Sequence, residues 1–330
     1  MNAQTVIAQY AQGNIDFDGQ DLHQANFSNT DLIGINLTQT DLQGAQFLFS
    51  FLNRANFTHS TLIGADLSGA NLSQAIFVRA NLRDADLHGA MLCAADLRSA
   101  DLTLADLIDA NLIDADLRNA DLSSANLTGA CLRGANLREE NRQYASKLCG
   151  AILWKADLRG ANLAGANLAK VDLREANLAE ASLRGADLRG ADLTGANLRG
   201  AFLTDVDGTG AILRKANLTH AKMERAIFND ADLAGARLTG AILPDVKLCK
   251  AHLARANLAQ AQLSRADLSR ASLRQAILRS ANLTDAYLAR TDLTDADLCD
   301  AGLVRAELSS ANLFGATLTG ATMPDGTVRT

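Results

Sequence analysis

The chain has 330 residues, of which 48% are hydrophobic and 21% charged, and its formal net charge is −6 at pH 7. This composition excludes a disordered chain, because it supplies enough apolar surface to offset the entropy lost on ordering. A general nucleic-acid binder should be basic, so the mild acidity disfavours direct nucleic-acid binding. No apolar run approaches the length of a membrane span, and we expect no membrane association.

The first fourteen residues differ from the rest of the chain. Val6, Ile7 and Tyr10 recur at helical spacing before Gly13, so residues 1–14 are expected to form a short N-terminal capping helix. This segment lacks the basic start and hydrophobic core of a secretory signal. The five cysteines are widely spaced and form no C-x-x-C pair, which is typical of free thiols in a reducing compartment. We therefore expect a cytoplasmic protein.

Two tracts of a five-residue repeat follow, over residues 15–137 and 148–323. From Phe17 to Leu137 every fifth residue is Leu or Phe, and from Leu148 to Met323 every fifth residue is Leu, Phe or Met, with Gly208 the only exception. Ala usually lies two residues before this position, and Asp or Asn usually lies one residue before it.

Three segments depart from the repeat. Residues 138–147 have no apolar residue at the repeat position and shift its phase by one residue, which predicts an interrupting loop or simple bulge. Residues 205–210 stay in phase and are expected to form one loose corner. Residues 324–330 are read as a C-terminal turn and tail, because Pro324, Asp325 and Gly326 are typical of a turn.

A period of five fits neither a helix nor an ordinary strand. It fits a coil that turns a corner in every repeat, with Ala and Leu inside and the other residues outside. Four repeats close one coil, and stacked coils would pair through their backbones. Asp and Asn suit such corners because they bond to nearby backbone N–H groups and tolerate unusual dihedral angles. The sequence therefore predicts an all-β solenoid.

Residues 15–323 resemble the pentapeptide-repeat family, as the segment Ala65-Asp66-Leu67-Ser68-Gly69 illustrates. The resemblance implies a right-handed quadrilateral β-helix of about 15 coils. The N-terminal pattern and the ending GATMPDGT are similar to cyanobacterial members of the heterocyst-regulating HetL type, in which a loop also interrupts the coils.

No catalytic constellation is visible in the sequence. The five histidines lie on different coils and none stands beside a Ser or Cys in a convincing triad. The segment from Gly208 to Gly210 begins like a phosphate loop but lacks its third glycine. We therefore expect no enzyme activity, small-molecule substrate, cofactor or metal.

The acidic residues of the first tract offer one functional alternative. Some members of the family protect gyrase and are thought to mimic DNA, so a negatively charged β-helix suggests a topoisomerase-binding protein. However, most acids before residue 138 occupy the repeat position that takes Asp or Asn in any case. The chain also ends in a polar turn rather than in the apolar cap through which those proteins dimerise, and we expect a monomer.

Apolar residues at outward positions favour a scaffold that binds a partner protein. The side of the coil through Leu32, Leu52 and Leu112 carries more of them than the other three sides. If residues 138–147 are a simple bulge, the same side continues through Leu153, and the loop adds polar and aromatic contacts. The expected partner-binding residues are Ile33, Phe51, Met91, Ile113, Arg142, Tyr144, Ile152 and Trp154.

Overall fold

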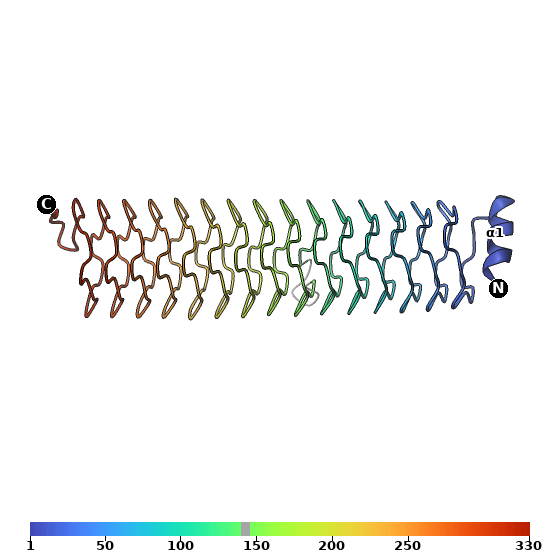
Figure 1. Cartoon of the computed structure of the whole chain (residues 1–330), viewed down its shortest axis with the longest axis horizontal. Helices are drawn as coiled ribbons and strands as arrows, with labels where there is room; N and C mark the ends of the chain where they lie inside the picture. The colour runs from blue at the N-terminus through green and yellow to red at the C-terminus, as the bar shows by residue number, and fades with distance from the viewer. Residues whose placement is uncertain (140–145) are drawn as a thin grey trace. The chain divides into compact units, whose positions relative to one another are not determined.

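The computed structural model describes residues 1–139 and 146–330. The chain forms two compact units, Met1–Val171 (unit 1) and Asp172–Thr330 (unit 2). One helix, α1 (Ala3–Ala11), begins unit 1, and both units otherwise consist of stacked coils (Figure 1). Their β structure is made of single-residue parallel bridges rather than long strands.

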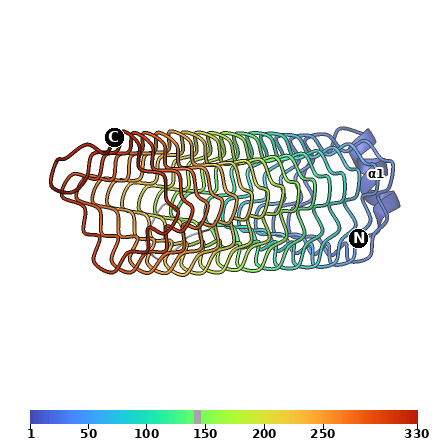
Figure 2. The same cartoon turned by 60° about the vertical axis from the view of Figure 1, so that its left-hand side comes forward.

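Each coil is a closed four-sided turn made of four repeats, and its outline is visible in Figure 2. The four sides follow one another in chain order. Each side forms one β-bridge with the same side of the next coil, which lies about 4.8 Å away. In the first coils of unit 1 these bridges join Asp16 to Asn36, Asp21 to Asp41, Asn26 to Gln46 and Asp31 to Phe51.

The interior is filled by the two apolar positions of the repeat. From Phe17 to Leu303, every Leu, Phe or Met at the repeat position in the described residues is at most 2% exposed. In most repeats the small Ala two residues earlier is buried as well, so large and small side chains alternate in the interior. The early coils use phenylalanine, and the rings of Phe27 and Phe47 stack with centroids 5.1 Å apart.

Two residues of each repeat shape the corner: one pairs with the next coil and the other takes the unusual dihedral angle. Asp66 lies in a bridge and its Oδ1 accepts a hydrogen bond from the Ser68 N–H at 3.0 Å, as expected. The unusual dihedral angle instead falls on the last residue of the repeat, where Gly44 has φ 64° and Phe49 has φ 51°. The prediction that Asp and Asn take that conformation is therefore wrong, because their position must stay extended to pair with the next coil.

The register changes once in unit 1, by six residues. Asp116 pairs with Asn136, four repeats further along, but Asp121 pairs with Lys147, 26 residues further along. The hydrogen bond of the buried Ser146 hydroxyl shows the same offset. It is donated to a carbonyl 29 residues earlier in the chain, whereas the equivalent Thr40 hydroxyl donates to a carbonyl 23 residues earlier. Six residues, 140–145, thus separate two complete repeats. Of the two expected alternatives the simple bulge is wrong, and most of the expected interrupting loop lies outside the described residues.

Gly208 keeps the regular register in unit 2. Its N–H donates to the Ile227 carbonyl at 2.7 Å, as leucines at this position do. A Cβ atom added to Gly208 would clash with the ring of Phe228, which follows it by one coil. The larger side chain therefore fills the volume that the glycine leaves, and the expected loose corner at 205–210 is a regular one.

Helix α1 contacts the first coils of unit 1. Asn2 caps it by accepting a hydrogen bond from the Thr5 N–H at 2.9 Å, and Val6 is fully buried. The Tyr10 hydroxyl donates to the Ile33 carbonyl at 2.8 Å. The helix is thus joined to the first coils by a side-chain hydrogen bond, and its role as a cap stays a prediction.

The last coil of unit 2 is less well covered. Leu308, Leu313 and Leu318 are half-buried, although they occupy the repeat position. The expectation that leucine lies inside the coil is only partly met for these three, because no further coil stacks on them in the described residues. Past Met323 the chain turns back, and Thr322 forms an antiparallel bridge with Val328.

Candidate interaction surface

In most repeats of the described residues, the residues on either side of the buried leucine and the residue at the corner are exposed or half-buried. These positions are free to be polar, so a large apolar side chain there is not required by the fold. In unit 1 such side chains gather on two neighbouring sides of the coil.

The first apolar side is the one whose buried residues include Leu32, Leu52, Leu92 and Leu112. On it, Ile33 is 45% exposed, Phe51 51% and Met91 40%, and Ile113 is half-buried. The bridge ladder runs from Phe51 through Asn71 to Met91, so a polar residue separates the two apolar ones. The structure brings these four predicted residues to one side, as expected.

Ile152 and Trp154 lie on a different side from the one expected. The ladder of the first apolar side continues from Cys131 to Asp157, whereas Ile152 pairs with Asn126. One side of the coil has five residues. Six inserted residues therefore place Ile152 and Trp154 one side earlier in the coil than a one-residue bulge would. The prediction that they extend the column of Phe51 and Met91 is wrong.

Their actual position is the second apolar side, which precedes the first in each coil. It also carries Leu48 and Ile108, both half-buried. Ile152 is 40% exposed and Trp154 37%. The Lys155 ammonium lies 4.2 Å from the centroid of the Trp154 ring, which favours a cation–π contact.

Phe49 occupies the corner between the two apolar sides and was not predicted. It is 60% exposed, and its ring lies where a Cβ atom on Gly69 would be. Its positive φ is uncommon for a bulky residue, because the left-handed region favours glycine. A phenylalanine at the last position of a repeat is the signal that would have identified it. The two apolar sides therefore form one surface that wraps the Phe49 corner, and we call it the apolar corner surface.

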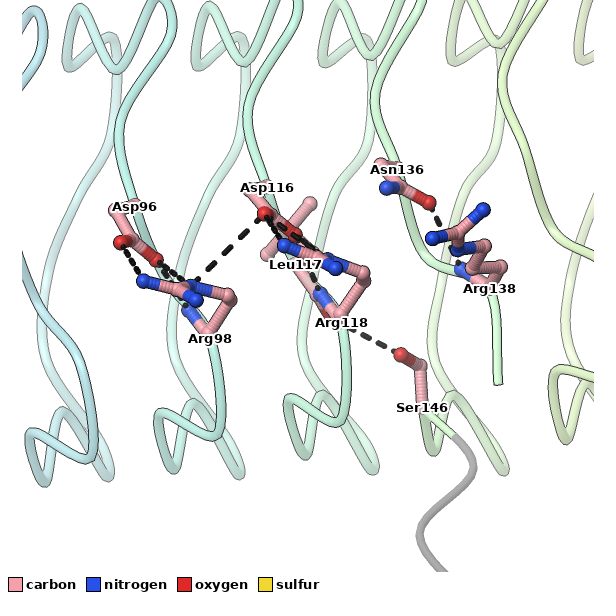
Figure 3. A network of polar contacts seen from close by, with 8 residues as sticks. All are labelled: Asp96, Arg98, Asp116, Leu117, Arg118, Asn136, Arg138 and Ser146. Carbon is pink, nitrogen blue, oxygen red and sulfur yellow. Dashed lines mark hydrogen bonds and ion pairs between the residues drawn. The ribbon is translucent and has the colours of Figure 1, made fainter. Parts of the chain in front are cut away.

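The other predicted contacts, Arg142 and Tyr144, lie outside the described residues. The described chain stops at Glu139 and resumes at Ser146, beside a column of arginines at Arg98, Arg118 and Arg138 (Figure 3). The side of the coil that carries this column immediately precedes the segment 140–145.

Two members of this arginine column are neutralised by aspartates. Arg98 contacts Asp96 through Nη2 at 2.7 Å, and Arg118 contacts Asp116 at 2.6 Å (Figure 3). The hydrogen bond and charge of Asp96 raise the pKa of Arg98. Burial disfavours the charged form of Asp116, but its hydrogen bonds from Arg118 outweigh this and lower its pKa. These pairs are typical of a stabilised surface rather than of reactive groups.

Three kinds of feature bear on the chemistry of the described part of the chain: metal-binding clusters, cysteine pairing and membrane-spanning helices. Within residues 1–139 and 146–330, no three His, Cys, Asp or Glu side chains are grouped so that they could hold a metal ion. The five cysteines are free. Among these same residues, no helix has the length and apolar character needed to cross a membrane.

The chain is a four-sided β-helical repeat protein, and its repeats match a known family. The model for pentapeptide repeats matches in segments that run from residue 21 to residue 320. The chain therefore belongs to the pentapeptide-repeat family. Membership implies the right-handed quadrilateral β-helix that the sequence predicts.

Several solved structures of pentapeptide-repeat proteins are similar to this chain. HetL from the cyanobacterium Nostoc, which is involved in regulating heterocyst differentiation, is 29% identical over 100% of both chains, with a TM-score of 0.18. A protein of the Arabidopsis thaliana thylakoid lumen is 34% identical over 30% of this chain and 70% of its own, with a TM-score of 0.30. The plasmid-mediated fluoroquinolone resistance protein QnrB1 is 20% identical over 68% of this chain and 93% of its own, with a TM-score of 0.26. No curated protein matches the chain.

Proposed function

We propose that the protein is a non-enzymatic scaffold that binds a partner protein at the apolar corner surface of unit 1. The segment 138–147 is proposed as a second contact, in which Arg142 and Tyr144 would supply adaptable polar and aromatic groups. The partner is a protein whose own surface carries apolar groups that these side chains would bury.

The observation that carries the proposal is the exposure of large apolar side chains at positions the repeat leaves free. Phe49, Phe51 and Met91 are each at least 40% exposed, and Trp154 and Ile152 lie on the adjoining side. Exposed apolar patches on soluble proteins are commonly interaction sites, and in this patch a polar residue, Asn71, lies between Phe51 and Met91. Aromatic residues and Met are enriched at interfaces, where truncation of a central residue often costs about 2 kcal/mol or more.

The alternative of DNA mimicry has less support from the acidic residues. Asp66, Asp86 and Asp106 occupy bridge positions, and each accepts a hydrogen bond from the N–H two residues later. The fold itself uses these carboxylates, so their number is not evidence for a nucleic-acid-like surface. We expect no inhibition of purified gyrase at concentrations comparable to the enzyme, and clear inhibition would favour the alternative.

A pair of matched triple variants tests the proposal. The test variant combines Phe49→Ser, Phe51→Ser and Ile113→Ser on the apolar corner surface. The control combines Ile242→Ser and Tyr287→Ser with Ile277→Ser, which removes exposed apolar side chains from unit 2 instead. Each variant and the parent are used as bait in extract of the encoding organism, and the captured proteins are quantified.

We expect the control to retain the partner and the test variant to lose it, while both melt at the temperature of the parent. Replacing Trp154 by Ser should weaken capture further, because it lies on the second apolar side. If the test variant captures every protein that the parent captures, the apolar corner surface is not the binding site.

A further inference from the structure

A second surface, on unit 2, is formed by positive charges that the fold does not require. Lys250, Arg270 and Arg290 occupy the same corner in three consecutive coils, and we call them the basic column. The Lys250 N–H donates to the carbonyl of Ser269, next to Arg270, at 3.0 Å, and the Arg270 N–H donates to Ala289 at 2.9 Å. All three side chains are exposed, and in the described residues none forms an ion pair.

The preceding corner of the same coils shows the arrangement that stability favours. There Asp205, Asp245 and Asp285 alternate with arginines, and each carboxylate receives two hydrogen bonds from one guanidinium, at 2.6 to 2.8 Å. The members of this paired column are Asp205, Arg225, Asp245, Arg265, Asp285 and Arg305.

Like charges on adjacent coils repel one another, as like charges across a sheet do. Two unit charges about 5 Å apart still interact by roughly 1 kcal/mol in water. One corner of these coils thus carries alternating negative and positive side chains, while the next carries three positive side chains. This accumulation of positive charge indicates a role outside folding.

The side that follows the basic column is hollowed and carries further cations. A hollow of about 490 Å³ has Ala234 and Ala254 in its lining, together with Lys215, Arg255 and Arg274. The Arg255 Nε is bonded to the neutral Gln275 at 3.0 Å, so its charge is not compensated by that contact. Arg274 is 3.2 Å from Asp292 at one end.

Acidic residues limit this basic region at both ends. Asp230 precedes Lys250 at the same corner, Asp232 lies beside it and pairs with Arg214 at 2.6 Å, and Asp292 and Asp295 follow at the other end. Three coils span only about 10 Å from first to last. This length fits three or four residues of an extended peptide at about 3.3 Å each. A nucleic acid, whose affinity comes from many phosphate contacts along its length, would meet the flanking acids.

We propose that this surface of unit 2 binds a short acidic peptide segment of a partner protein. Carboxylates of the segment would pair with the basic column, since guanidinium–carboxylate pairs are strong and bidentate. The hollow on the side that follows, which Lys215 and Arg255 help to line, would take a further acidic side chain of the segment. The inference concerns unit 2 and does not depend on the proposed function of unit 1.

Fluorescence anisotropy with a labelled hexaglutamate peptide tests this inference on the full chain at low ionic strength. The test variant is Lys250→Gln with Arg270→Gln and Arg290→Gln. The control, Arg225→Gln with Arg265→Gln and Arg305→Gln, removes the same net charge from the paired column. Hexaglutamine serves as the uncharged peptide, and circular dichroism checks that both variants fold.

We expect the test variant to bind hexaglutamate at least about tenfold more weakly, while the control stays within about twofold of the parent. An equal loss in both variants would overturn the proposal, because binding would then follow net charge alone. It would also be overturned if the parent does not bind hexaglutamate, or if a single-stranded oligonucleotide binds the parent more tightly and loses affinity in the test variant.

Discussion

The pairing of Gly208 with Phe228 makes a quantitative prediction about the core. Gly208→Leu restores the consensus residue, yet we expect it to destabilise the protein by about 2 kcal/mol through overpacking, because its side chain meets the Phe228 ring. Backbone strain does not contribute, since Gly208 has no left-handed φ. Phe228→Leu alone leaves part of the ring volume empty and should cost about 1.5 kcal/mol.

The double variant separates this explanation from a general intolerance of the site. With leucine at both positions, the two consecutive coils regain the packing found elsewhere, and we expect stability within about 0.5 kcal/mol of the parent. The coupling free energy is then about 3.5 kcal/mol, at or slightly above the upper end for residues in contact. Chemical denaturation of the four proteins, followed by circular dichroism, measures it. Additive losses in the double variant would refute the idea that Phe228 occupies the volume beside Gly208.

Three further predictions concern the coils. Leu112→Arg should cost more than about 4 kcal/mol, because it places an unpaired charge at a fully buried position, and near-normal melting would contradict the assigned register. The hydrogen bond from Arg265 lowers the pKa of Asp245, so this pair should stabilise the protein above pH about 4 and lose its effect as the pH falls, and Arg265→Gln should flatten that part of the melting profile. Deleting residues 140–145 joins two complete repeats and should leave the melting temperature nearly unchanged, while partner capture weakens.

The repeat allowed most of the fold to be predicted, because its two inward positions are specified in almost every coil. The length of the interruption could not be predicted in the same way. The spacing from Leu137 to Leu148 equals two repeats plus one residue, and it equally equals one repeat plus six. The backbone pairings of the structure distinguish the two, as in the bridge from Asp121 to Lys147 and the hydroxyl contact of Ser146.

The candidate site depended on that distinction. Phe51 and Met91 precede the interruption, so counting four repeats for each coil predicts their side correctly. Ile152 and Trp154 follow it, and the same counting placed them one side away from their position. Phe49 was missed because the prediction compared the sides of the coil and did not consider the last position of the repeat, where this phenylalanine is 60% exposed.

The central claim is that the apolar corner surface of unit 1 binds a protein partner, and Trp154 provides a direct measurement. It is the only tryptophan in the chain and is 37% exposed, so its emission reports on this surface alone. A partner recovered with the parent and free of tryptophan, or with its own tryptophans replaced, is titrated into the protein while emission and acrylamide quenching are recorded. We predict that emission shifts to shorter wavelength and quenching falls as the complex forms. Saturable binding that leaves both signals unchanged would contradict the claim, because the partner would then occupy another part of the molecule.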